Sequence, residues 1–412
     1  MTDVVSRSGN RISVRERVSH FHLRQIAASL HRSVTVAGYR DIALDFSLCT
    51  GVTEAVMLPL MPIVTKYRKE NVGFTFTPPI QEDLARLFIN TNWAHHVSPE
   101  TYELSHHEGG HVPALRFGDN DIDNSFQILD RVLDLILRQL ETSRDTLKAV
   151  EWSLWEIMDN VSSHAESEIG GFIQATAYKQ GNRVEFVVAD AGVGIPSSMR
   201  MKNHAEALQR AIGEGVTSKP AQNAGNGLYG SYQAAFLSGG QFEINSLLGH
   251  LFCDGTTGQV TCKGENIPYA GTSVRCSINV HDPDLLGKAL RFKGRNHDPA
   301  FDYIERKYEG DSGEIVFVLA DEAQRDLGSR QGGARIRRMI ENLTKDYACI
   351  VIDFAGIGII SSSFADEVFG RLFVQLGPRT FMTRIRMQNV DSTIEGLIDR
   401  AILQRTKLGD AS

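Results

Sequence analysis

The chain has 412 residues, of which 42% are hydrophobic and 23% are charged, as in an ordinary soluble globular protein. This composition excludes a disordered, collagen-like or small disulfide-rich protein, and the length leaves room for about two to three domains. The formal net charge of −7 provides no overall attraction to nucleic acid or to an anionic membrane, so neither is expected as a partner.

The N-terminal region offers no targeting signal. Residues 1–20 are polar and charged and predict a flexible tail, without the apolar segment of a secretory signal. The longest apolar run, residues 55–64, is interrupted by two prolines and is too short to cross a bilayer. The five cysteines form no CxxC pair. We therefore expect a cytoplasmic protein with free thiols and no membrane segment.

Residues 21–115 predict a small α/β domain. A strand is expected over 41–46, a helix over 53–69 and another strand over 72–76. Several histidines gather in the last part of this block: His95, His96, His106, His107 and His111. Their spacing matches no zinc-binding pattern, so we do not favour a metal site there.

Residues 116–281 form the next block, and its first half is helical. Apolar residues recur with helical spacing over 122–150, which predicts a long amphipathic helix, and a second helix is expected over 151–165. The following expected elements are the strands 171–179 and 183–189 with a turn at 180–182, a Gly/Asn-rich stretch over 211–230, and several short strands between 241 and 280.

The second of these helices carries a line of polar residues. Glu156, Asn160 and His164 are spaced i, i+4 and i+8, so they share one face of the helix. On a helix otherwise rich in large apolar residues, this line indicates a binding or catalytic site. A solvated stripe gives the same pattern.

Two glycine-containing segments follow. Asp190 ends a predicted strand and precedes Gly192 and Gly194, which permit close approach of the backbone to a ligand; an ordinary turn would look the same. The second segment, Gly225-Asn-Gly227-Leu228-Tyr-Gly230, opens a helix and offers backbone N–H groups to a phosphate. It lacks the Gly-Lys-Ser/Thr of a Walker A loop, and the segment before it is not a strand, as a Rossmann fingerprint requires.

In order and spacing, these segments resemble the GHKL (Bergerat-fold, histidine-kinase-like) ATP-binding family, in its anti-sigma-kinase-like branch. Residues 156–160 resemble the N-box, residues 190–194 and 225–230 the two glycine boxes, and Gly271-Thr272-Ser-Val the final Gly-Thr strand. The resemblance covers roughly residues 120–280. It implies a central two-layer α/β sandwich that binds ATP and Mg²⁺.

The same resemblance implies roles for the matched residues. Glu156 would be the catalytic base, Asn160 the Mg²⁺ ligand and Asp190 the acceptor for the adenine amine, with Thr272 supporting the adenine end. The residues that would shape the ATP pocket are Gly192, Gly194, Gly225, Gly227, Leu228 and Gly230. Residues 200–224 would form a mobile lid, in which Lys219 would contact a phosphate or remain solvated.

The last part of the chain is read as a linker, residues 282–300, and a C-terminal block, residues 301–412. A strand over 313–319, a helix over 332–344 and a strand over 348–354 are expected in this block. Its second strand and the Gly/Ser-rich segment that follows resemble STAS-like domains, the small α/β units related to anti-anti-sigma factors. Residues 21–115 resemble the same fold more weakly.

The serines after this strand have two interpretations. In anti-anti-sigma factors a serine at this turn is phosphorylated by a GHKL kinase, so the resemblance makes Ser362 and Ser363 possible phosphoacceptors. The neighbouring sequence Ser363-x-x-Asp366 also fits a capping box, in which a serine caps a helix.

Together, these observations predict a multidomain protein of the α+β or α/β class, with a central GHKL domain and a small STAS-like domain on either side. The expected function is an ATP- and Mg²⁺-dependent regulatory switch, a slow ATPase whose nucleotide state is relayed to the STAS-like domains and to a protein partner, with a homodimer also considered. One alternative is a serine kinase of the anti-sigma-factor type that acts on a STAS-like domain. Another is a nucleotide-gated interaction protein without turnover.

Overall fold

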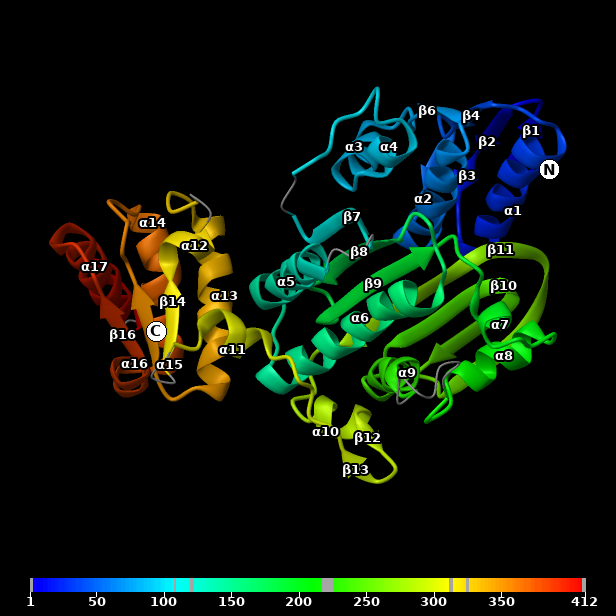
Figure 1. Ribbon diagram of the computed structural model, residues 1–412. Helices are drawn as coiled ribbons and strands as arrows, with labels where there is room; N and C mark the ends of the chain where they lie inside the picture. The colour runs from blue at the N-terminus through cyan, green and yellow to red at the C-terminus, as the bar shows by residue number, and fades with distance from the viewer. Residues whose placement is uncertain are drawn as a thin grey trace. The chain divides into compact units, whose positions relative to one another are not determined.

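A computed structural model describes residues 3–106, 109–118, 122–216, 225–310, 314–323 and 326–409 (Figure 1). The chain divides into two compact units. The first, called the pocket unit here, consists of Met1–Val132, Ala149–Asn279 and Leu285–Asp298. The second, called the C-terminal unit, consists of Leu133–Lys148, Val280–Asp284 and Pro299–Ser412. Mixed α/β multidomain architecture is thereby confirmed, whereas the specific GHKL sandwich stays a prediction.

The pocket unit begins with an α/β block. Its strands run in the order β1 (Val5–Ser8), β2 (Arg11–Val14), β4 (Asp41–Asp45) and β6 (Gly73–Thr77), with β2, β4 and β6 parallel and β1 antiparallel to β2. Its other elements are α1 (His20–His31), η1 (Arg32–Val36), α2 (Glu54–Lys69), α3 (Glu82–Asn90), α4 (Trp93–Val97) and the paired short strands β3 (Glu16–Arg17) and β5 (Cys49–Gly51). The strand, helix and strand expected between residues 41 and 76 are confirmed to within one residue.

The expected N-terminal tail is instead part of this block. Strands β1 and β2 lie within residues 1–20, and Ile12 and Val14 are completely buried. Strand β2 pairs with β4 in a register that places Ile12 opposite Leu44. The polar composition of the segment hid this strand, because only its inward-facing positions are apolar and its partner lies about 30 residues away.

The central sheet of the pocket unit has the strand order β10 (Gln241–Asp254), β11 (Gln259–Asn279), β9 (Arg183–Asp190), β8 (Gly171–Tyr178) and β7 (His111–Phe117), with antiparallel neighbours. The β8–β9 hairpin is confirmed. The short strands expected between 241 and 280 are wrong, because β10 and β11 form one long hairpin interrupted by bulges at Ser246–Gly249.

Helices cover the central sheet (Figure 1). They are α5 (Ile122–Gln139), α6 (Arg144–His164), α7 (Ile195–Ser198), α8 (His204–Ala211) and α9 (Gly227–Leu237). Helix α9 packs on β10 and β11, and α2 of the N-terminal block packs on β8 and β9. Strand β9 is buried at every position after its first residue, as expected for a strand covered on both faces.

The expected helix boundary at residues 150–151 is wrong. The break lies at residues 140–143, between α5 and α6, where the Thr146 N–H donates to Ser143 Oγ at 3.3 Å. Apolar spacing continues through this turn, so periodicity alone concealed it. The signal was the polar Thr142-Ser143 pair, since serine immediately before a helix satisfies an N–H of the first turn.

The N-terminal block shares one hydrophobic core with the central sheet. This core includes Leu58 and Trp93 of the block together with Phe172, Val187 and Tyr269 of the sheet. The Trp93 indole Nε1–H also donates to Gln174 Oε1 at 2.7 Å. The block is therefore an integral layer of the pocket unit.

Residues 285–298, expected to belong to a linker, are structured. They form α10 (Leu285–Ala289) and a hairpin of β12 (Arg291–Phe292) and β13 (Arg295–Asn296). Helix α10 packs on α9, and the side chains of Leu285 and Leu290 are completely buried. The linker interpretation is therefore wrong for this segment. Its many charged, exposed residues made the buried Leu285 and Leu290 hard to recognise in the sequence.

The C-terminal unit contains the parallel strands β14 (Ile315–Val318), β15 (Ile350–Asp353) and β16 (Ile385–Gln388), in that order. Its helical elements are α11 (Tyr303–Tyr308), α12 (Leu319–Ala323), α13 (Arg330–Asp346), α14 (Ser362–Ala365), η2 (Asp366–Gly370), α15 (Arg371–Leu376), α16 (Pro378–Arg384) and α17 (Ser392–Gly409). Within the described ranges, no helix is both long and apolar enough to span a membrane.

Candidate functional site

The pocket unit contains a cavity of about 360 Å³. It is bounded by α6, the end of β9, the start of α9, strand β11 and the β12–β13 hairpin. The predicted site residues found in its wall are Glu156, Asn160, Asp190, Gly194, Gly225, Gly227, Leu228 and Thr272. Residues separated by more than 100 positions in the sequence therefore meet in one cavity.

Helix α6 forms one wall of this cavity. Glu156, Asn160 and His164 all line it, so the polar line seen in the sequence faces a pocket. Burial, reinforced by the nearby negative charge of Asp159, raises the pKa of Glu156 to about 7. A carboxyl group with this pKa can both accept and release a proton near neutral pH.

The first turn of α9 lies against this wall. A Cβ atom on Gly227 would lie 2.1 Å from Glu156 Oε2, and one on Gly230 would lie 2.4 Å from the Trp152 ring. A side chain at either position would force Glu156 or Trp152 to shift. The N–H groups at the start of α9 are thereby brought beside the Glu156 carboxyl group, at the end of the helix that favours anions.

Asp190, at the end of β9, also lines the cavity. Its Oδ1 atom accepts hydrogen bonds from the N–H groups of Gly192 at 2.8 Å and Thr272 at 3.3 Å. Burial nevertheless raises the pKa of Asp190 to about 7. Gly192 is needed here because a Cβ atom would lie 2.0 Å from the carbonyl oxygen of Ala165, at the end of α6. Gly192 thus shapes the site from behind the cavity wall.

Ser246, beside the bulge of the β10–β11 ladder, connects this ladder to the glycine segment after Asp190. It accepts from the Ile195 N–H at 2.9 Å and donates to the Gly271 carbonyl oxygen at 2.9 Å. Gly194, just before Ile195, has a φ of +81°, which glycine adopts without strain. The sequence analysis did not identify Ser246, because nothing in its neighbourhood distinguishes it from other strand serines.

The N-terminal block contacts the back of the Asp190 segment. The hydroxyl of Tyr269 lies within hydrogen-bonding distance of the carbonyl oxygens of Pro59, at 3.0 Å, and Asp190, at 3.3 Å. Lys66 donates from Nζ to the Ala191 carbonyl oxygen at 3.3 Å. Helix α2 therefore supports the wall that holds Asp190.

An aromatic part of the wall was missed in the sequence. Phe292 and His297 of the β12–β13 segment line the cavity with Trp152 of α6. The ring centroid of Trp152 lies 5.9 Å from that of Phe292 and 6.0 Å from that of His297. Lys293 and Gly294 both have positive φ, as in a tight hairpin turn, and this dipeptide was the available signal for a hairpin.

Other predicted residues lie elsewhere. Lys219 is outside the described residues, so its phosphate contact stays a prediction. In the C-terminal unit, Ser361 is the residue that caps α14: its Oγ accepts from the Phe364 N–H at 3.0 Å and lies 2.9 Å from Ser363 Oγ. The cap therefore falls two residues before Ser363, while Ser362 is exposed.

Two of the clustered histidines, His95 and His96, contact backbone carbonyl groups. His95 Nδ1 lies 2.8 Å from the Tyr102 oxygen, and His96 Nε2 lies 2.9 Å from the Ala114 oxygen. Burial lowers the pKa of His96 to about 4. These contacts give His95 and His96 a structural role, and His107 lies outside the described residues.

Comparison with known proteins identifies one part of the chain. Residues 332–395 match a family described as a STAS-like domain of unknown function (DUF4325). The match runs from α13 to the first turn of α17 and confirms the STAS-like resemblance for this part of the C-terminal block. No curated protein matches the chain. The chain thus contains a segment similar to STAS-like domains, and the function of the pocket unit must be argued from its own geometry.

Proposed function

We propose that the pocket unit binds ATP with Mg²⁺ and acts as a slow ATPase switch. The observation that carries this proposal is the meeting of Asp190, Asn160, Glu156 and the N-terminus of α9 in one cavity of about 360 Å³. Each supplies what a different part of the nucleotide requires, namely an acceptor for an amine, a metal ligand, a base and donors for phosphate.

Different residues of the cavity wall would bind the two ends of the nucleotide. Asp190, held by the N–H groups of Gly192 and Thr272, would accept a hydrogen bond from the adenine amine. The triphosphate would extend toward the N-terminus of α9, because backbone N–H groups at a helix start stabilise phosphate oxygens. Glu156 lies at that end, next to Gly227.

The charge of the cavity fits a divalent cation. Glu156, Asp159 and Asp190 contribute carboxyl groups, and among the described residues that line the cavity none is Lys or Arg. A triphosphate in such surroundings requires a counter-charge, and oxygen ligands suit Mg²⁺. Asn160 Oδ1 would hold the ion, which when bound would neutralise charge on the phosphates.

In this mechanism Glu156 acts as the general base. Its carboxylate would take a proton from a water as the water oxygen bonds to the γ-phosphorus and the bond to the leaving ADP oxygen breaks. The raised pKa of Glu156 suits the return of that proton after each cycle. Trp152 and Phe292 would limit the access of bulk water to this end of the cavity, consistent with slow turnover.

Serine phosphorylation is the second candidate function, and the exposure of Ser362 favours it. This side chain stands at the first position of α14, while Ser361 and Ser363 hydrogen-bond to each other. A phosphate on Ser362 would lie at a helix start, where negative charge is favourable. A protein partner and a homodimer also stay predictions.

The test measures binding and turnover separately. Nucleotide affinity would be measured by calorimetry with a non-hydrolysable ATP analogue and Mg²⁺, and turnover with γ-labelled ATP by following free phosphate and label on the protein. For Glu156→Gln we expect affinity within about threefold of the wild type and hydrolysis reduced at least ~100-fold. For Asn160→Ala we expect loss of Mg²⁺-dependent binding.

The control is Ser162→Ala, which changes an exposed residue of α6. It should leave both measurements unchanged. Label on the protein that disappears in Ser362→Ala would favour the kinase, and binding without either product would favour a non-catalytic switch. Absence of nucleotide binding by the wild-type protein would overturn the proposal as a whole.

A further inference from the structure

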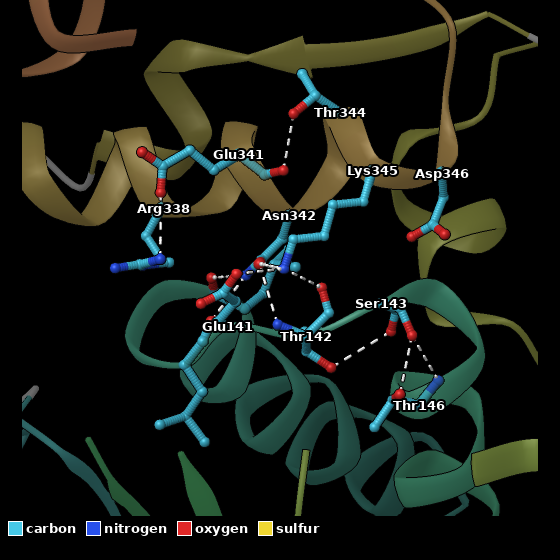
Figure 2. Close-up of polar contacts among 12 residues, drawn as sticks. Glu141, Thr142, Ser143, Thr146, Arg338, Glu341, Asn342, Thr344, Lys345 and Asp346 are labelled. Atoms are coloured by element: carbon cyan, nitrogen blue, oxygen red, sulfur yellow. Dashed lines mark hydrogen bonds and ion pairs between the residues drawn. The ribbon is translucent and has the colours of Figure 1, made fainter. Parts of the chain in front are cut away.

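The turn between α5 and α6 belongs to the C-terminal unit, where helix α13 holds it. Asn342 of α13 is only 2% exposed, and its Nδ2 donates to the carbonyl oxygens of Leu137 at 3.1 Å and Leu140 at 2.8 Å. Its Oδ1 accepts from the Thr142 N–H at 3.1 Å (Figure 2). One buried amide therefore satisfies backbone groups at the end of α5 and within the helix break.

These backbone groups lack partners within their own helices. The last four carbonyl groups of a helix and its first four N–H groups have no intrahelical bond. Leu137 belongs to the last turn of α5, Leu140 directly follows that helix, and Arg144 begins α6. The Arg144 N–H donates to Asp346 Oδ2 at 2.7 Å. Helix α13 thus caps the end of α5 and the start of α6.

Lys345 completes this contact. Its Nζ donates to the Thr142 carbonyl oxygen at 3.3 Å and pairs with Glu141 at 3.2 Å. Asn342, Lys345 and Asp346 are spaced i, i+3 and i+4, so they share one face of α13. Figure 2 shows Asn342 and Lys345 reaching from that face to Thr142. The break in the helix is therefore specified from outside the helix as well as by Ser143.

Helix α6 connects this turn to the proposed nucleotide site. Its first residues, 144–148, belong to the C-terminal unit, and from Ala149 onward it belongs to the pocket unit. It is continuous to His164, so Glu156 lies about 18 Å along the helix from Arg144 at about 1.5 Å per residue. A change in the direction or register of the first turn would move Glu156 and Asn160 with it.

We propose that Asn342 is a positioning residue for the nucleotide pocket. By holding the α5–α6 turn, it sets the register of α6 and makes ATP affinity depend on the state of the STAS-like unit. Because linkage between two sites is reciprocal, bound nucleotide must stabilise the same turn. This inference rests on the proposed ATP-binding function and names the residue through which that site is regulated.

The first test compares two variants of α13 in the full-length protein. Asn342→Leu keeps the side-chain size but removes its hydrogen bonds to the turn. The control Thr344→Val removes a buried hydroxyl whose bond, to the Glu341 carbonyl oxygen at 2.8 Å, stays within α13. We expect Asn342→Leu to weaken binding of the ATP analogue about 5- to 20-fold, and Thr344→Val to change it less than twofold.

The second test starts with the wild-type protein, so its main result does not depend on the folding of a variant. Hydrogen exchange would be measured with and without the ATP analogue and Mg²⁺. We expect bound nucleotide to slow exchange in residues 137–146 as well as at Gly192 and Gly227. In Asn342→Leu, protection at the two glycines should persist at saturating nucleotide, whereas protection of the turn should be lost.

The two proposals fail in different ways. If the wild-type protein binds nucleotide but exchange in residues 137–146 does not change, the role of Asn342 is wrong and the ATP site stands. Equal effects of Asn342→Leu and Thr344→Val on affinity would also overturn it, because both would then act through the stability of α13. If the wild-type protein binds no nucleotide, the proposed function fails, and the inference fails with it.

Discussion

The N-terminal block and the C-terminal unit use similar elements in different ways. Each contains parallel strands connected through helices: β2, β4 and β6 in the former, β14, β15 and β16 in the latter. The N-terminal block merges its apolar core with the central sheet through residues such as Leu58 and Trp93. Within the C-terminal unit, polar side chains of α13 hold the α5–α6 turn.

The two regions are connected to different carboxyl groups of the pocket. The N-terminal block supports the segment of Asp190 from behind, through Tyr269 and Lys66. Glu156 lies on α6, whose first turn is held by Asn342. Apolar burial is non-directional and favours a permanent layer, whereas a few directional hydrogen bonds can be exchanged at small cost. We therefore expect the N-terminal block to be structural and the C-terminal unit to be regulatory.

The largest expected effect comes from breaking the shared apolar core. Trp93→Ala should lower the unfolding free energy of the pocket unit by about 3–5 kcal/mol, because a large side chain and its bond to Gln174 are lost. The matched control is Phe317→Ala on β14, equally buried but in the C-terminal unit. Denaturant unfolding, monitored by hydrogen exchange, would show in which unit each variant loses stability. Equal destabilisation of the pocket unit by both variants would contradict the comparison.

Asp190→Asn should separate binding from stability. Losing the charged acceptor should weaken ATP binding by roughly 30- to 100-fold. Burial raises the pKa of Asp190 from 3.8 to about 7. The ionised carboxylate therefore destabilises the folded protein; this destabilisation is absent below pH 3.8 and complete only above pH 7.

The variant should therefore raise the unfolding free energy of the nucleotide-free protein at pH 8 by on the order of 2–4 kcal/mol, and by much less at pH 5. Calorimetry and thermal unfolding at both pH values would measure these effects. An increase in unfolding free energy that does not depend on pH would show that Asp190 is not buried as a carboxylate.

Tyr269→Phe tests the link between α2 and Asp190. It removes only the hydroxyl that bonds to the carbonyl oxygens of Pro59 and Asp190. We expect a loss of stability of about 0.5–1.5 kcal/mol and a change in ATP affinity below about fivefold. Denaturant titration and calorimetry would measure both. A loss of binding as large as that of Asp190→Asn would mean that the N-terminal block regulates the site.

The smallest effect is expected from Asp159→Asn on α6. The charge of Asp159 contributes to the raised pKa of Glu156, about 7, after the larger effect of burial. Hydrolysis should increase as pH rises through 7, because the base must be ionised. Removing the neighbouring charge should move this increase to lower pH. A pH–rate profile that does not shift would exclude Glu156 as the titrating base.

Local patterns in the sequence were sufficient to predict the strand ends and the glycine segments of the pocket. The β8–β9 hairpin and the polar line on α6 depend on period-2 and period-3.6 patterns within about 20 residues. Gly192 and Gly227 were identified by position alone, and the structure supplies the reason: a Cβ atom on either would overlap Ala165 or Glu156. The grouping of these segments came from family resemblance, and their meeting in one cavity came from the fold.

Other features depend on partners far away in the sequence. The strand that buries Ile12 and Val14 is stabilised by pairing with β4, and the hairpin carrying Phe292 and His297 is anchored on α9 through α10. Their own sequences are polar, so neither composition nor periodicity distinguishes them from a tail or a linker.

The sequence by itself determined the class of the fold, several of its longer strands and helices, and the residue types of the candidate pocket, because these follow from local backbone preference and apolar spacing. Only the tertiary structure decided where α5 ends and α6 begins, which serine caps α14, and which residues close the aromatic side of the cavity. The physical reason is that a cap, a strand pairing or a cavity wall depends on groups brought from elsewhere in the chain. Asn342 shows this most directly, since it satisfies carbonyl groups about 200 positions before it.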